Sequence, residues 1–111
     1  MDELAKRVEM LEFQQRLLLR MLKNSDDQLY YLIVDKRLDQ EETEELLKLC
    51  ERMNKKFEKQ KAEGYVTFYP LLNELSESLN EKISLKELVA ACLRQGVFVD
   101  YMETLKQLLK D

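Results

Sequence analysis

Breaks in regular structure are scarce in this sequence. Two glycines, Gly64 and Gly96, and one proline, Pro70, interrupt 111 residues. Glycine and proline are the residues that most often end helices and form tight turns. Between them, apolar residues recur at intervals of three and four, as on one face of a helix. We therefore predict an all-α fold, a compact bundle of about six helices with short connections.

The whole chain, residues 1–111, has the size of a single helical domain. Apolar residues make up 45% of the chain and charged residues 36%, a balance typical of globular rather than disordered proteins. Within this domain we expect a long amphipathic N-terminal helix over residues 3–23, followed by a helical body over residues 26–111.

The predicted N-terminal helix has the apolar spacing of a coiled coil. The residues at its heptad a and d positions form the candidate self-association face: Leu4, Val8, Leu11, Gln15, Leu18 and Leu22. Other apolar residues lie off this seam: Met10, Phe13, Leu17, Leu19 and Met21. A helix with apolar residues around so much of its surface needs partners on two sides. Gln15, the polar seam position, would set the register against a second copy at some cost in stability.

Two outcomes are open for this apolar surface. The helix either folds into the core of its own chain or presents more apolar surface than five shorter helices can cover. Burying about 500 Å² more against a partner would contribute on the order of 12 kcal/mol at ~25 cal/mol/Å². Association costs about 4–15 kcal/mol or more. We expect self-association, with a dimer favoured.

Local signals mark two helix starts in the body. Asp39 with Glu42, and Ser84 with Glu87, have the spacing of a capping box, in which each side chain accepts a bond from the other residue's backbone N–H.

The run YVTFY at residues 65–69 is the most strand-like part of the sequence. We interpret it as a corner between helices, because no second strand is visible to pair with it. Thr67 is the predicted N-cap of the following helix, with Pro70 inside its first turn and Val66 and Leu71 forming a hydrophobic staple. A strand that pairs across a dimer is the alternative.

The composition removes several kinds of chemistry. The chain contains no histidine, which excludes Ser-His and Cys-His catalysis and histidine zinc sites. Cys50 and Cys92 lie among apolar neighbours, and we expect both to be buried thiols in a reducing compartment. We see no signal peptide and no apolar run of 18 residues, so we expect a cytoplasmic protein. No catalytic, cofactor or metal site is predicted.

Carboxylates offer the remaining route to catalysis. Glu41, Glu44 and Glu45 lie at the start of a predicted helix, and Glu74 and Glu77 form a second acidic pair. Helical hydrolases hold magnesium between such pairs, but Asn80 stands where another aspartate would help. A magnesium-dependent hydrolase is therefore an alternative function. The usual interpretation of such a cluster is a solvated helix start that the helix dipole favours.

Nucleic-acid regulation is a further alternative. Four lysines that could contact phosphates lie near the end of the third predicted helix: Lys55, Lys56, Lys59 and Lys61. Glutamates interleave with them, as on a mixed-charge solvated face, and the net charge of −4 disfavours a polyanionic partner.

Three stretches of the sequence carry a resemblance to a known family. They are YLIVDKRLDQEE (residues 31–42), KQKAEGYVTFYPLL (residues 59–72) and SLNEKISLKELVAACLRQGVFVDYMETL (residues 78–105). In these stretches the chain resembles the YhaI-like family, short uncharacterised proteins of Bacillus-type bacteria. The resemblance implies an all-helical fold and association through helices, and it brings no activity, cofactor or site residue.

Taken together, these features favour a cytoplasmic, self-associating helical protein that acts as an adaptor or regulator by binding another protein. We expect no membrane partner.

Overall fold

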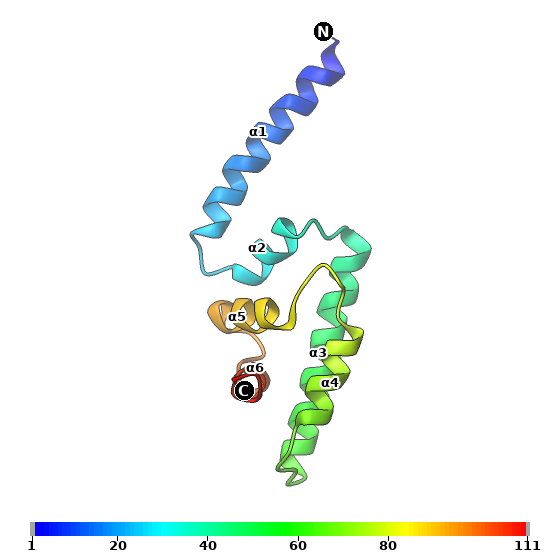
Figure 1. Cartoon of the computed structure of the whole chain (residues 1–111). Helices are drawn as coiled ribbons and strands as arrows, with labels where there is room; N and C mark the ends of the chain where they lie inside the picture. Colours follow the sequence, from blue (N-terminus) through cyan, green and yellow to red (C-terminus); the bar gives the residue numbers. More distant parts are fainter. Residues whose placement is uncertain (1, 111) are drawn as a thin grey trace.

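The computed structural model describes residues 2–110 and confirms the predicted all-α fold (Figure 1). The described residues form six helices: α1 (Glu3–Lys23), α2 (Gln28–Asp35), α3 (Gln40–Ala62), α4 (Tyr69–Ser78), α5 (Leu85–Gln95) and α6 (Val99–Leu108). The predicted long N-terminal helix corresponds to α1. None of the helices within residues 2–110 has the length and apolar composition of a membrane-spanning segment.

Helix α1 extends away from the other five helices, with the N-terminus at its far end (Figure 1). The molecule is therefore elongated, with extents of 64 × 25 × 23 Å and a radius of gyration of 17.2 Å. A compact domain of this length has a radius of gyration of about 13 Å. The excess follows from α1, which contains no buried residue.

The core lies in the body formed by α2–α6, and all 18 buried apolar residues within residues 2–110 belong to it. Helix α3 contributes five of them: Leu46, Leu49, Cys50, Met53 and Phe57. Phe57 packs against Tyr101 of α6, with ring centroids 5.3 Å apart. The Tyr101 hydroxyl donates a hydrogen bond to the Leu71 carbonyl of α4 at 3.1 Å, which satisfies the one polar atom of this fully buried side chain. The body thus closes a core without α1.

The run at residues 65–69 is a corner, as predicted. Gly64 follows α3 with a φ of +91°, a left-handed conformation that suits glycine. Residues 65–68 have no regular secondary structure, and α4 begins at Tyr69 with Pro70 in its first turn.

The predicted N-cap of α4 is wrong. Phe68, not Thr67, occupies the N-cap position, and Val66 is 93% exposed, so it forms no staple with Leu71. A tertiary contact takes precedence over the local signal here. The ring of Phe68 packs 4.9 Å from that of Phe57, and this contact fixes where the chain turns into α4.

Both predicted capping boxes are present. The Asp39 side chain accepts a bond from the Glu42 N–H at 2.8 Å, and that of Ser84 accepts one from the Glu87 N–H at 3.1 Å. The reciprocal bonds, from the Asp39 and Ser84 N–H groups to the glutamate side chains, are also made.

Helix α2 begins differently. Asp27 is its N-cap but its side chain makes no capping bond. Instead, the Leu29 N–H donates to the side-chain oxygen of Gln95 in α5 at 2.9 Å. This bond ties α2 to α5, two helices that lie side by side in Figure 1 and pack directly against each other.

Candidate interaction surfaces

The predicted self-association face lies on the exposed helix α1. Its apolar members are largely open to solvent, and Leu11 and Leu18 at its centre are 64% and 63% exposed. Gln15 between them is also exposed, whereas Leu22, near the turn into α2, is partly buried. Because the six residues have heptad spacing on a helix, they lie along one side of α1. We call this set the α1 seam.

A second apolar stripe runs along a different side of α1. Met10, Phe13, Leu17 and Met21 recur at intervals of three and four, and all four side chains are exposed. Helix α1 thus has eight exposed large apolar side chains in all: Leu4, Val8, Met10, Leu11, Phe13, Leu17, Leu18 and Met21. Single exposed apolar residues are ordinary on a protein surface, whereas a contiguous set of this size is a candidate interaction surface.

Helix α2 contacts α1 beside the seam. The α1 side of the cleft between them consists of Glu12, Gln15, Arg16 and Leu19. The other side consists of Val34 and Asp35 of α2 and of Arg37 and Leu38, which follow this helix. Because Leu11 and Leu18 stay exposed, α2 flanks the seam rather than covering it.

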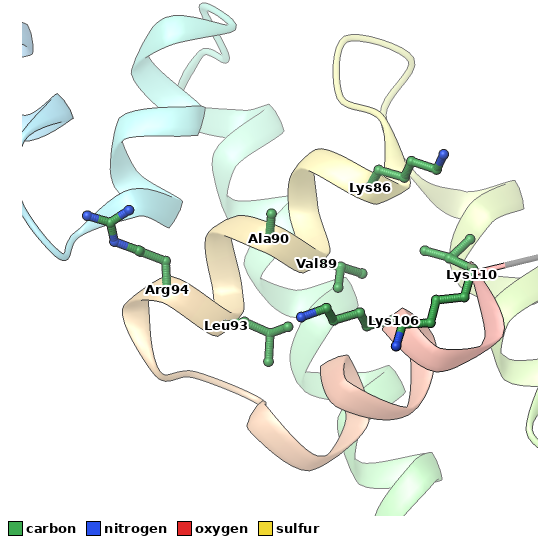
Figure 2. Close-up of a pocket in the computed structure, with 8 residues that line it drawn as sticks. Lys86, Val89, Ala90, Leu93, Arg94, Lys106 and Lys110 are labelled. Carbon is green, nitrogen blue, oxygen red and sulfur yellow. The ribbon is translucent and has the colours of Figure 1, made fainter.

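A second concave surface lies between α5 and α6, a region that the sequence did not single out (Figure 2). It is a groove of about 560 Å³ on the side of the body formed by these two helices, and we call it the α5/α6 groove. Its apolar lining residues are Val89, Ala90, Leu93 and Leu109. Its polar lining residues are all cationic: Lys86, Arg94, Lys106 and Lys110.

Neighbouring acids leave these cations largely free. Glu87, next in sequence to Lys86, pairs instead with Lys36 of α2 at 2.9 Å, and the hydrogen bond from Lys36 lowers the pKa of the Glu87 carboxyl. Arg94 approaches Asp26 at 3.9 Å, but both side chains are well exposed. Such an exposed pair contributes little to stability and does not prevent Arg94 from meeting another anion.

The carboxylates of the hydrolase alternative do not form one site. Glu41, Glu44, Glu45 and Glu77 are exposed, and both oxygens of Glu74 accept bonds from Lys56, at 3.0 and 2.8 Å. Within residues 2–110, no three acidic or cysteine side chains are grouped as a metal site requires.

Glu42, next to that acidic cluster, has a structural role. One of its carboxylate oxygens accepts a bond from Lys82 at 2.8 Å and the other accepts one from Asn80 at 2.9 Å. The bond from Lys82, the backbone N–H of Asp39 and the amide of Asn80 together lower the pKa of Glu42 to about 2. Asn80, which interrupts the acidic pattern in sequence, is thus a donor to Glu42 and ties the α4–α5 connection to α3.

The four lysines of the nucleic-acid alternative are not equivalent. Lys56 is engaged with Glu74, and Lys61 lies 5.8 Å over the ring of Phe57. Lys55 and Lys59 are exposed. The cations that line a concave surface are those of α5 and α6, which sequence reasoning did not group. Their spacing within α5, at i and i+8 around Val89, Ala90 and Leu93, was the available signal.

The two cysteines are both free and fully buried, as expected. The fold also brings them together from α3 and α5, although 42 residues separate them in sequence. The neighbouring thiol of Cys50 and burial raise the pKa of Cys92, so this thiol is held in its neutral, unreactive form.

Comparison with known families gives one match over nearly the whole chain. A family model described as "Protein of unknown function (DUF1878)" matches residues 1–110. The chain therefore belongs to the DUF1878 family, and α1 lies within the matched region together with the body.

Proposed function

We propose that this protein is a self-associating interaction module, an adaptor or regulator that pairs with a second copy of itself through the α1 seam. The observation that carries the proposal is that α1 contains no buried residue and yet has a seam of apolar residues along its length, interrupted only by Gln15. The proposed activity is binding, without a catalytic step.

A helix that packs against nothing is only marginally stable in water. Single helices in water are marginal even at 12–15 residues of alanine-rich sequence, and most helical stability comes from packing of an apolar face. Helix α1 is 21 residues long and packs within its own chain chiefly against α2. Pairing of the seam with a second α1 would supply the missing packing.

The seam residues favour a parallel, two-stranded arrangement. The d positions are all leucine, at Leu4, Leu11 and Leu18, and the first a position is the β-branched Val8. Leucine at d with β-branched residues at a is typical of parallel dimers.

Gln15 supports the same arrangement. In a parallel, in-register pair, an a residue faces the same residue of the partner, so two Gln15 amides would meet and bond to each other. In an antiparallel pair, a residues face d residues, and the amide would lie unpaired against leucine. A buried polar group without a partner costs about 1–3 kcal/mol.

Charge also fits the parallel register. Arg7 is at a g position and Glu12 at the e position five residues later. In a parallel pair these positions adjoin across the interface, so Arg7 of each copy would meet Glu12 of the other. Both side chains are exposed in the single chain and thus accessible to a partner.

The test is the molar mass in solution, measured by light scattering on a size-exclusion column at tens of micromolar protein. We expect twice the chain mass of 13.3 kDa. A mass of 13.3 kDa at this concentration would overturn the proposal.

A matched pair of double variants locates the contact. Leu11→Asp with Leu18→Asp places charge on the seam and should give a folded monomer. Met10→Asp with Leu17→Asp makes the same chemical change on the second stripe of α1 and should leave the dimer intact. The circular dichroism of the body should persist in both, because no α1 residue belongs to the core.

Orientation is tested by cross-linking of a Leu4→Cys variant under mild oxidation. In the parallel register the two introduced thiols lie side by side and should form a disulfide. In an antiparallel pair the Leu4 positions would be at opposite ends, about 27 Å apart at 1.5 Å per residue. The native chain is the control, since its cysteines are buried.

The proposal extends to the location and the origin of the protein. Free, buried cysteines suit a reducing compartment, which supports a cytoplasmic location. The resemblance to the YhaI-like family of Bacillus-type bacteria supports a bacterial origin, and it agrees with association through helices.

A further inference from the structure

The α5/α6 groove combines an apolar floor with a cationic rim, and the proposed pairing through α1 makes no use of it. We propose that it binds an acidic amphipathic helix of a partner protein, with the partner's apolar side on Ala90, Leu93 and Leu109 and its carboxylates on the surrounding cations. This site is independent of the α1 seam.

The arrangement of α5 sets the shape of the ligand. Lys86, Ala90 and Arg94 recur at intervals of four along this helix, and Val89 and Leu93 lie beside them (Figure 2). Lys86 and Arg94 are about 12 Å apart along the helix axis at 1.5 Å per residue. Helix α6 contributes Lys106, and Lys110 lies just after its C-terminal end (Figure 2). A fitting ligand is therefore extended, apolar in the middle and negatively charged in several places around it.

Charge complementarity selects the occupant. The chain has a net charge of −4, yet none of the eight described lining residues is acidic and four are cationic. A fatty acid would engage one cation with its single carboxylate and leave the others unused. An amphipathic helix with apolar residues at i, i+3, i+4 and i+7 and flanking glutamates would engage cations on both helices.

Other occupants fit less well. The second stripe of α1 has Glu3 as well as Lys6 and Arg20 close to it on the helix surface, so a second copy would bring mixed charge, including cations, against the cationic rim. The described lining residues include no aromatic side chain on which a nucleic-acid base could stack.

The test uses a fluorescein-labelled helical peptide of about 14 residues, long enough at 1.5 Å per residue to span the groove. It carries leucines at i, i+3, i+4 and i+7 with glutamates flanking them. A second peptide has lysine at every glutamate position. We expect fluorescence anisotropy to report binding of the glutamate peptide to the full-length protein, and no binding of the lysine peptide.

Two groove variants and one control variant test whether the peptide binds in the α5/α6 groove. Ala90→Glu puts a carboxylate on the exposed edge of the groove, and Lys106→Glu reverses a rim charge. Each should weaken binding of the glutamate peptide at least about tenfold. Lys55→Glu makes the same charge reversal on α3, outside the groove, and should leave the affinity unchanged. Ala90 is exposed and glutamate is a good helix former, so thermal unfolding should confirm that the variant is folded.

Ionic strength and competing ligands provide two further tests of peptide binding. Raising the ionic strength from about 0.01 to about 1 M shortens the Debye length from about 30 to about 3 Å and should weaken binding strongly. Absence of binding, equal binding of both peptides, or unchanged affinity in both groove variants would overturn the proposal. Displacement of the labelled peptide by vesicles of anionic lipid or by a long-chain fatty acid, at concentrations at which the unlabelled glutamate peptide does not compete, would also overturn it.

Discussion

The two long helices of this protein have similar lengths but differ in how much of their apolar surface is buried. Helix α3 has 23 residues, and its apolar stripe, which includes Cys50, Met53 and Phe57, is buried in the core. Helix α1 has 21 residues and buries none of them. Both helices have apolar residues at helical intervals, and this pattern shows only that each helix needs a surface to pack against, in its own chain or in another. Whether the partner is in the same chain depends on where the rest of the fold places it.

The connections explain the difference. Helix α3 is joined to α4 by the corner at residues 65–68, and the two helices run alongside each other (Figure 1). Phe68 of this corner packs on Phe57 of α3. After α1, the turn at Asn24–Asp27 leads into the short helix α2, whose buried residues Leu29, Leu32 and Ile33 belong to the core of the body. Within residues 2–110 no return helix covers α1, so its apolar seam stays exposed.

The largest expected difference between α1 and α3 concerns a pair of phenylalanine substitutions. Phe57 of α3 is 1% exposed and Phe13 of α1 is 52% exposed. Phe57→Ala should lower the free energy of unfolding by about 3–5 kcal/mol, through lost burial and the cavity left behind. Phe13→Ala should change it by less than about 0.5 kcal/mol. Chemical denaturation measures both, and comparable losses would show that α1 is part of the core.

A pair of tyrosines tests the polar contact inside the body. Tyr101→Phe removes the hydrogen bond to the Leu71 carbonyl and should cost about 1 kcal/mol, the net value of a typical buried hydrogen bond. Tyr69→Phe, at a half-exposed position, serves as the control and should change stability by less than about 0.5 kcal/mol. Equal effects of the two substitutions would contradict the role given to Tyr101.

Loss of an N-cap should have different consequences in the two regions. Ser84→Ala removes the capping bond of α5 and should destabilise the whole body by about 1 kcal/mol. Asp2→Ala removes the capping bond to the Ala5 N–H at the start of α1. It should loosen the first turn of α1 and leave the unfolding midpoint of the body unchanged. A shift of that midpoint by Asp2→Ala would mean that α1 and the body unfold as one unit.

The smallest effect concerns pH. The pKa of Glu42 is lowered to about 2 from its ordinary 4.5, so its ionised form is the one that the fold stabilises. Its contribution is complete above about pH 4.5 and is lost as pH falls toward about 2. Glu42→Gln should lower the thermal midpoint at neutral pH, and the difference from the native protein should shrink over this range. Glu41→Gln is the control, and a difference that grew toward low pH would contradict the assignment.

Features that depend on nearby residues could be predicted from the sequence. The capping boxes at Asp39 and Ser84, and the end of α3 at Gly64, each follow from residues within one turn of helix. The α1 seam follows from heptad spacing in the same way. Its exposure was one of two outcomes that the sequence left open, because exposure depends on which helices reach α1 in space.

Features that join distant residues could not be predicted. The Gln95 side chain that caps α2 is 66 residues from Leu29, and no local pattern marks it. The α5/α6 groove is a partial exception: the spacing of Lys86 and Arg94 marks its α5 side, but no local pattern shows that Lys106 and Lys110 line the same groove. Phe98 adopts a left-handed φ of +53°, which is unfavourable for a bulky residue, and its ring packs against the core as compensation. Only the tertiary packing determines that conformation.

Hydrogen exchange of the α1 amides as a function of protein concentration distinguishes a helix that a second copy stabilises from one that is stable in the single chain. We propose the first, with a body that is complete by itself. At tens of micromolar, α1 amides should be protected, and they should exchange much faster after dilution, while amides of α3 keep their protection. Protection of α1 that does not change on dilution from a dimer to a monomer would contradict the account.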